Sequence, residues 1–352
     1  MYILLAILIF GLLIFVHELG HFIAAKALGV KVNEFAICMG PPIVQKKIGE
    51  TTYSLRSIPI GGFCAMEGED EASDNPRAFT SAKWWKRLII LVAGAFMNFL
   101  AGFVIIALVF SSAEGFGTAR IESFYPGSAL EEGGLQVGDT LYSVDGQRIY
   151  LSSDVSMLLG RLRDDRADLV VLRDGQKVKY PDFLVEKREF EIDGKKQMLY
   201  GINLGYEEAT FGRLLKNSWY SCVDFSRMVW MGLGDLLTGR ATLQDVGGPV
   251  TIVSTMSETG KAASSTAEGI LNVLYFGAFI AVNLAVMNML PIPALDGGRV
   301  FALLVTIVLE KLLCRKINPK YEGYIHAAGM VLLLAFMAFI TFHDVWMMIY
   351  KK

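Results

Sequence analysis

The stretch ILLAILIFGLLIFVHELGHFIAAKAL, residues 3 to 28, is long and apolar enough to cross a membrane as a helix. It shows no small-residue cleavage site and is longer than a signal peptide needs to be. Yet His17, Glu18 and His21 stand inside it. Each ionisable residue in a membrane helix costs roughly 2.5 to 3.5 kcal/mol on insertion scales. Three within one turn indicate a functional site, with a polar helix-packing cluster as the structural alternative.

The composition of the whole chain agrees with several membrane spans. The 352 residues are 53% hydrophobic and the mean hydropathy is +0.43, which is high for a soluble domain. A net charge of −2 offers no long-range attraction for nucleic acid, so no nucleic-acid partner is expected. The cysteines are scattered and predict neither a disulfide framework nor a metal site. They are Cys38, Cys64, Cys222 and Cys314.

Three more segments, 88 to 111, 270 to 290 and 325 to 348, are apolar over a spanning length. The predicted fold class is therefore a polytopic α-helical membrane protein with four transmembrane helices. His326 and His343, near the ends of the last span, are expected at the membrane interface and not as ligands. Segment 211 to 238 is also apolar, but its charges favour an amphipathic helix on a surface, within a helical linker over 210 to 268. Those charges are Lys216, Asp224, Arg227 and Asp235.

Lysine and arginine in the short connections predict the orientation. The connections between spans one and two and between spans three and four are basic, so the positive-inside rule places both in the cytoplasm. Region 112 to 268 is then extracytoplasmic, and His17 lies toward the cytoplasmic side of span one. Lys351 and Lys352, at the opposite end of span four, favour the reverse orientation, but the basic residues of the two connections are more numerous. The basic residues counted are Lys31, Lys46, Lys47, Arg56, Arg77, Lys83, Lys86, Arg87, Arg299, Lys311, Arg315, Lys316 and Lys320.

The region from 112 to 209 contains short β-like runs separated by glycine turns, which predict a small β-rich domain. Within it, PGSALEEGGLQVGDTLYSVDGQRI, residues 126 to 149, resembles the core signature of PDZ domains. The carboxylate-binding loop of such domains is not obvious in EGFGTARI, residues 114 to 121. The alternative is a plain β-rich spacer.

A second β element is predicted between the first two spans. IVQKKI, residues 43 to 48, and TTYSLRSI, residues 51 to 58, flank Gly49 and Glu50, a two-residue connection that favours a type II′ hairpin. PIGGFCAM follows directly, so the element is expected over 43 to 66. It either dips into the membrane against the spans with one strand edge free, or it is an ordinary cytoplasmic hairpin.

The pattern HELGH, residues 17 to 21, has the spacing of a zinc hydrolase. Histidines four apart project from one helix face and can hold one zinc ion at roughly 2.0 to 2.1 Å each. Glu18 can take a proton from a zinc-activated water and pass it to the leaving amine.

A catalytic zinc needs a third protein ligand and one open position. Asp296, in NMLPIPALDGGR at residues 288 to 299, is the only carboxylate in or beside span three. Pro291 and Pro293 break the helix there, so the backbone must line a cavity or pack on protein. Pairing with Arg299 or capping a helix is the alternative role for Asp296.

Together these motifs resemble the site-2 protease family, and specifically its bacterial regulator-of-sigma-E protease branch. The resemblance covers nearly the whole chain, and the pair of HExxH and NxxPxPxLDG inside spans is very specific. The matching stretches are HELGH at 17 to 21, PIGGFCAMEGE at 59 to 69, GAFMN at 94 to 98, GGPV at 247 to 250 and NMLPIPALDGG at 288 to 298.

The resemblance implies an intramembrane zinc metalloprotease of the bacterial inner membrane. It would cut single-span membrane substrates such as anti-sigma factors or residual signal peptides. The implied zinc ligands are His17, His21 and Asp296, with Glu18 catalytic and Asn288 stabilising the oxyanion. Gly61, Gly62 and Phe63 match the family's substrate-clamping β element. Asn98 is expected to be a buried hydrogen bonder, with packing weighed against a substrate-binding role. Some relatives have two PDZ domains, whereas this chain has room for one.

Two other classes of function stay open from the sequence. The chain could be a metal-ion transporter that uses the intramembrane His and Asp residues. It could also be a membrane scaffold whose PDZ-like domain gathers partners beside a vestigial metal site. Neither role needs the glutamate next to the first histidine.

Overall fold

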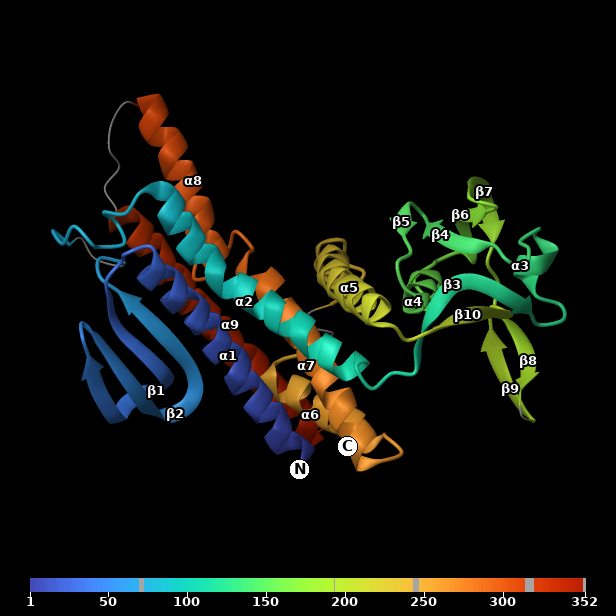
Figure 1. The fold of residues 1–352 in the computed structure, drawn as a ribbon, viewed down its shortest axis with the longest axis horizontal. Coiled ribbons are helices and arrows are strands. Elements are labelled where there is room, and N and C mark those ends of the chain that lie inside the picture. The colour runs from blue at the N-terminus through green and yellow to red at the C-terminus, as the bar shows by residue number, and fades with distance from the viewer. Residues whose placement is uncertain (70–72, 193, 243–246, 314–319, 351–352) are drawn as a thin grey trace. The chain divides into compact units, whose positions relative to one another are not determined.

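The computed structural model describes residues 1–69, 73–192, 194–242, 247–313 and 320–350. Cys314, Arg315 and Lys316 lie outside the described residues, as do Lys351 and Lys352. The chain divides into two compact units (Figure 1). One comprises Met1–Val109 and Phe225–Lys352, and the other comprises Phe110–Asp224.

Four helices are long and apolar enough to cross a membrane. They are α1 (Tyr2–Ala27), α2 (Trp84–Phe110), α7 (Thr266–Asn288) and α9 (Lys320–Tyr350), of which Gly323–Phe342 is the apolar part. They correspond to the four spans predicted from the sequence. Many of their leucine, isoleucine and phenylalanine side chains are exposed, as expected for helices whose surroundings are lipid.

Helix α1 is the common packing partner of the first unit. Its N-terminal half packs on α6 (Pro249–Lys261) and α7 through a cluster that includes Leu13, Met256 and Ile280. Its C-terminal half packs on α2 and the β-hairpin through a second cluster that includes Phe35 and Ile90. The segment that carries HELGH therefore lies where the two clusters meet.

The β-hairpin consists of β1 (Val32–Ile48) and β2 (Thr51–Met66), both longer than predicted. The predicted two-residue connection is present, and Gly49 has the positive φ of +64° that the first position of a type II′ turn requires. The strands curl, so that residues 34–37 pair with residues 62–65 on one side and with residues 52–55 on the other. Within the described chain, the outer edge of residues 62–65 pairs with no further strand.

Charged contacts fasten the hairpin turn to the end of α1. Glu50 accepts hydrogen bonds from Arg77 at 2.7 and 2.8 Å and from Lys26 at 3.0 Å. The Arg77 guanidinium, and then Lys26, hold the pKa of the Glu50 carboxyl at about 2. The turn is thus tied to the helix that carries the two histidines.

The second unit is β-rich. A sheet in the order β10-β3-β4-β6-β7, with β5 paired to β4, accompanies the separate ribbon β8-β9 and the short helices α3 and α4. The elements are β3 (Gly115–Phe124), α3 (Ala129–Glu132), β4 (Thr140–Val144), β5 (Gln147–Arg148), α4 (Ser152–Leu159), β6 (Arg166–Arg173), β7 (Gln176–Leu184), β8 (Arg188–Ile192), β9 (Lys195–Leu199) and β10 (Ile202–Glu208). Asp139 is buried and binds Arg173 through both carboxylate oxygens at 2.7 Å. Burial alone would raise the pKa of Asp139, but Arg173 and the Gln136 N–H lower it below the usual range.

Two more helices belong to the fold. Helix α5 (Phe211–Leu237) lies where a helix was predicted, and it buries Cys222 and exposes Trp219 and Trp230. Helix α8 (Asp296–Leu313) follows α7 after an irregular loop and was not predicted from the sequence. Cys38, Cys64 and Cys222 are free thiols in the described chain.

Helix α9 contributes an acidic cap to α6. Asp344 is 7% exposed, and its carboxylate accepts hydrogen bonds from the backbone N–H of Gly248, at 3.4 Å, and of Thr251, at 3.2 Å. These N–H groups begin α6 and have no partner within the helix. The GGPV stretch at 247 to 250 thus packs directly against this carboxylate.

We therefore expect Asp344→Ala to lower the free energy of unfolding by about 1 to 2 kcal/mol, the usual cost of losing a helix cap. Asp344→Asn should retain most of this stability, because an amide oxygen also accepts. Thermal unfolding of the purified chain in detergent measures the effect, with exposed Phe342→Ala on the same helix as the control. An unchanged unfolding midpoint in Asp344→Ala would show that the contact adds nothing.

Candidate metal centre

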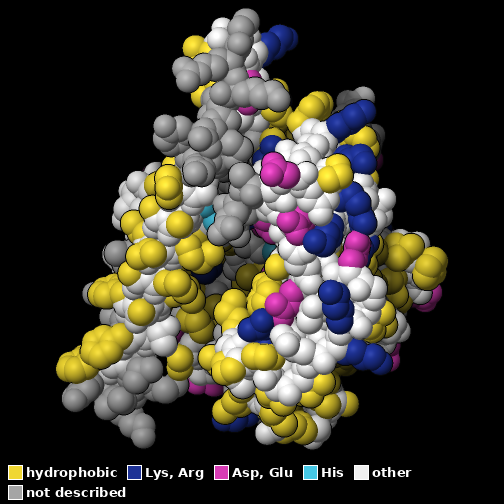
Figure 2. Space-filling model, turned by 90° about the vertical axis from the view of Figure 1, so that its left-hand side faces the viewer, with side chains coloured by type: hydrophobic (Ala, Val, Ile, Leu, Met, Phe, Trp, Pro, Cys, Tyr) yellow, Lys and Arg dark blue, Asp and Glu magenta, His cyan; other side chains and the backbone are white. Residues whose placement is uncertain are grey.

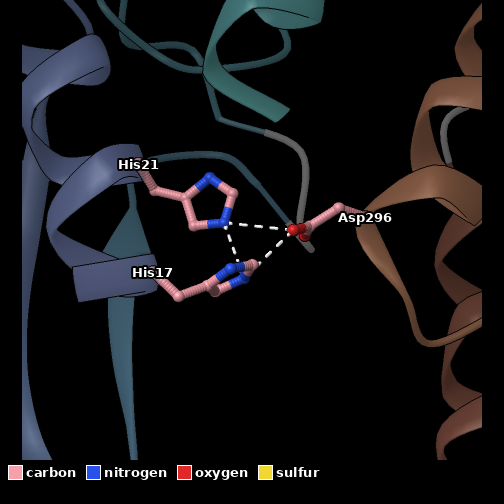
Figure 3. Close-up of side chains that lie close together, drawn as sticks. All are labelled: His17, His21 and Asp296. Carbon is pink, nitrogen blue, oxygen red and sulfur yellow. Dashed lines mark hydrogen bonds and ion pairs between the residues drawn. The ribbon is translucent and has the colours of Figure 1, made fainter. Parts of the chain in front are cut away.

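Three side chains predicted as metal ligands meet in the structure (Figure 3). His17 and His21 project from one face of α1, one turn apart, and Asp296 is the first residue of α8. Asp296 Oδ2 lies 3.1 Å from His17 Nε2 and 3.2 Å from His21 Nε2. The two Nε2 atoms are 3.3 Å apart.

These three distances fit a single tetrahedral zinc ion. Bonds of roughly 2.0 to 2.1 Å in a tetrahedron separate neighbouring ligand atoms by about 3.3 to 3.4 Å. Two imidazole nitrogens and one carboxylate oxygen are also a donor set that zinc accepts, with the fourth position left open. In the described chain, no well-directed hydrogen bond reaches the buried Asp296 Oδ2. A lone pair is therefore available there for a cation.

The side chains of this cluster are partly exposed in the described chain. The side chains of His17, His21 and Asp296 are 13%, 9% and 20% exposed, respectively. Figure 2 shows a hollow in one face of the molecule in which histidine side chains are visible. Parts of the three side chains are thus exposed, although the Asp296 Oδ2 atom itself is buried.

The loop before α8 sets the position of Asp296. A Cβ at Gly297 would lie 2.3 Å from the carbonyl of Met289, and one at Gly298 would lie 2.2 Å from the Ile292 oxygen. Only glycines allow the loop to fold back so closely on the start of the helix. Ala294 in the same loop has φ of +85°, a strained value for a residue with a Cβ.

Helix α9 supports this loop through His326 and Gly329. His326 Nδ1 accepts a hydrogen bond from the Ala294 N–H at 3.2 Å, and a Cβ at Gly329 would lie 2.3 Å from Pro293 Cβ. The sequence placed His326 at the membrane interface and not among the ligands, and the structure adds this contact with the loop, which was not predicted. The side chain of His343 lies outside the described residues. No pattern local to span four indicated the contact with Ala294.

Arg299 does not neutralise Asp296 in the structure. It forms an ion pair with Glu69, and its Nε lies 3.2 Å from His326 Nε2. The alternative in which Asp296 pairs with Arg299 is therefore not the arrangement found. Instead, Arg299 joins the start of α8 to the segment that follows β2.

The outer nitrogens of the two histidines have different partners. His21 Nδ1 lies 2.8 Å from the Ile90 carbonyl oxygen, so it donates there and leaves the Nε2 lone pair free. His17 Nδ1 faces two amides instead, with Asn98 Nδ2 at 3.3 Å and Asn288 Nδ2 at 3.5 Å. Asn98 and Asn288 therefore belong to the surroundings of His17.

Strand β2 passes beside Glu18. A Cβ at Gly62 would lie 3.5 Å from Glu18 Cγ and 3.0 Å from the Ala36 oxygen. Gly61 has φ of +83° and packs on Met39. The Arg56 guanidinium lies over the Phe63 ring, 4.9 Å from its centroid. Of the three predicted substrate-binding residues of the hairpin, the structure places Gly62 next to the glutamate.

Helix α2 approaches the site through a glycine. A Cβ at Gly94 would lie 2.3 Å from His21 Nε2, one of the three clustered donor atoms, and 2.8 Å from His17 Cε1. Any side chain at Gly94 would thus occupy the space between the imidazoles. Because residue 94 is a glycine, this space remains available for the two imidazole rings and for a group bound between them.

Comparison with known proteins agrees with the geometry. The model of peptidase family M50 matches residues 5–336. A candidate zinc metalloprotease of Clostridium perfringens is 36% identical over 98% of this chain and 98% of its own length. The regulator of sigma-W protease RasP of Bacillus subtilis is 25% identical over 96% of this chain and 97% of its own length, and zinc metalloprotease RasP of Geobacillus kaustophilus is 26% identical over 96% of each. This multi-pass membrane chain therefore belongs to peptidase family M50, the site-2 proteases, and is a zinc metalloprotease.

Proposed function

We propose that this chain hydrolyses a peptide bond within the transmembrane segment of single-span membrane proteins, with zinc held by His17, His21 and Asp296. The observation that carries the proposal is the triangle of ligand atoms with sides of 3.1 to 3.3 Å. Two of the three atoms belong to α1, whose other charged residues are Glu18 and Lys26, and the third belongs to the first residue of α8. The transporter and scaffold alternatives are not favoured, since relatives along the whole chain are named zinc metalloproteases.

The residues around the ligands have distinct chemical roles. Bound zinc supplies Lewis-acid polarisation of the scissile carbonyl and makes a water acidic near neutral pH. Glu18, within electrostatic reach of His17 and Asp296, takes the proton of the attacking water and delivers it to the leaving amine. The Asn288 amide donates a hydrogen bond to the oxyanion that forms at the scissile carbonyl.

The hairpin presents the substrate in extended form. A helical substrate must open before cleavage, because its peptide bonds are shielded by their own hydrogen bonds. The unpaired outer edge of residues 62–65 offers backbone groups to an added strand, and Gly62 brings that edge beside Glu18. Gly61, Gly62 and Phe63 are thus the substrate-binding part of the hairpin.

The substrate class and the cellular setting are inferred by analogy. A relative named as a regulator of sigma-W protease suggests an anti-sigma factor or a residual signal peptide as substrate. The basic connections place the active site toward the cytoplasmic side of the bacterial inner membrane. In this arrangement residues 112 to 209 form an extracytoplasmic PDZ-like domain, and residues 210 to 268 link it to the second half of the membrane core.

Glu18→Gln should lower peptide cleavage by at least about 10²-fold while leaving zinc bound, because the amide cannot accept the water proton and Glu18 is not a ligand. Purified enzyme with a single-span membrane substrate in detergent gives the rate, and elemental analysis gives the zinc content. Cleavage at the wild-type rate by the mutant would exclude Glu18 as the base.

Gly94→Ala should abolish stoichiometric zinc binding, since the added Cβ would fall 2.3 Å from His21 Nε2. Gly11→Ala in α1 is the matched control, because a Cβ there meets nothing within 4 Å. Zinc content per folded chain distinguishes the two. A Gly94→Ala protein that holds zinc as wild type does would place the metal elsewhere.

A further inference from the structure

His17 needs a hydrogen-bond acceptor at its outer nitrogen. To bind a metal through Nε2, a neutral imidazole must carry its proton on Nδ1, and ligating histidines almost always donate that proton. His21 donates to the Ile90 carbonyl. In the described chain, the polar atoms placed beside His17 Nδ1 are the amide nitrogens of Asn98 and Asn288. Either amide could supply the acceptor by turning to present its oxygen.

The two asparagines are not equivalent in this respect. Asn98 is 1% exposed, and its Oδ1 is buried without a hydrogen-bond partner among the described residues. Asn288 is half-buried, at the C-terminal end of α7, and has no such orphaned atom. Turning the Asn98 amide by 180° exchanges its oxygen and nitrogen within the same volume. It would bring Oδ1 to about the present 3.3 Å from His17 Nδ1, in place of Nδ2.

We propose that Asn98 is a positioning residue of the metal centre. Its amide oxygen accepts the hydrogen bond of His17 Nδ1–H and so holds the ring with Nε2 directed at the metal. This inference rests on the proposed ligand set and replaces both roles considered for Asn98, packing and substrate binding. The two amides then have different roles: Asn98 accepts the hydrogen bond from His17, and Asn288 faces the scissile carbonyl.

The place of Asn98 on α2 supports this role. Asn98 lies four residues after Gly94, on the same helix face. Gly94 leaves space for the two imidazoles, and Asn98, one turn later, orients the ring of His17. The α1 and α2 backbones are also in close contact, since a Cβ at Gly20 would lie 2.4 Å from the Ala93 oxygen. The amide is therefore held at a fixed distance from His17.

The test compares zinc affinities of full-length protein in detergent by competition with a chromophoric chelator. Partners of this kind contribute 10- to 100-fold to metal affinity, so Asn98→Leu, which keeps the volume but removes the acceptor, should weaken zinc binding by about that factor. Asn98→Asp, which always presents an oxygen, should restore it. Asn288→Leu is the matched control and should change the affinity less than about 2-fold while lowering cleavage.

A second readout follows the metal's coordination directly. The visible absorption of the cobalt-substituted protein should change in Asn98→Leu and return to the wild-type form in Asn98→Asp. If Asn98→Leu does not fold, Asn98→Ala makes the same comparison. Wild-type zinc affinity in Asn98→Leu, or equal losses in the Leu and Asp variants, would overturn the inference and leave Asn98 as a packing residue. A folded wild type that binds no zinc would instead overturn the proposed function itself.

Discussion

The structure depends on bringing two imidazoles and one carboxylate to a common point inside an apolar helix bundle. Each of these groups is costly to place there alone, and a divalent cation shared by all three would offset that cost. The ligand atoms already lie at tetrahedral spacing, so the surrounding fold holds them in place. Much of the first unit can be understood as the support that this spacing requires.

That support comes from three directions. Helix α1 sets the histidine pair, and α2 contributes the space at Gly94 and the buried amide of Asn98. The loop before α8 aims Asp296 and is held by His326 and Gly329 of α9. Helix α9 contributes none of the three clustered side chains but is still part of the site, since it fixes the loop that leads into Asp296. The hairpin completes the arrangement by bringing Gly62 beside Glu18.

The sequence predicts the four spans, the hairpin turn and the histidine pair because each depends on a local pattern, whereas Asp296 was predicted as the only carboxylate in or beside span three and through the family resemblance. Apolar length indicates a span, Gly49 indicates a turn, and HELGH carries its own spacing. Helix α8 was missed because Pro291 and Pro293 precede it and because its first turn contains Gly297 and Gly298, which mask an amphipathic run. The contact of His326 with Ala294 and the ion pair of Glu69 with Arg299 join residues far apart in the chain. The curled pairing of residues 34–37 with two segments of β2 likewise depends on tertiary packing and not on strand pattern.

The most direct test is the zinc content per chain of purified wild type and of Asp296→Ala, measured in parallel by elemental analysis. The account requires about one zinc per wild-type chain and a clear loss in the mutant, because Asp296 supplies one of three protein ligands. That result would join two motifs 275 residues apart, His21 and Asp296, into one site. Equal zinc in both proteins, or none in a folded wild type, would contradict it.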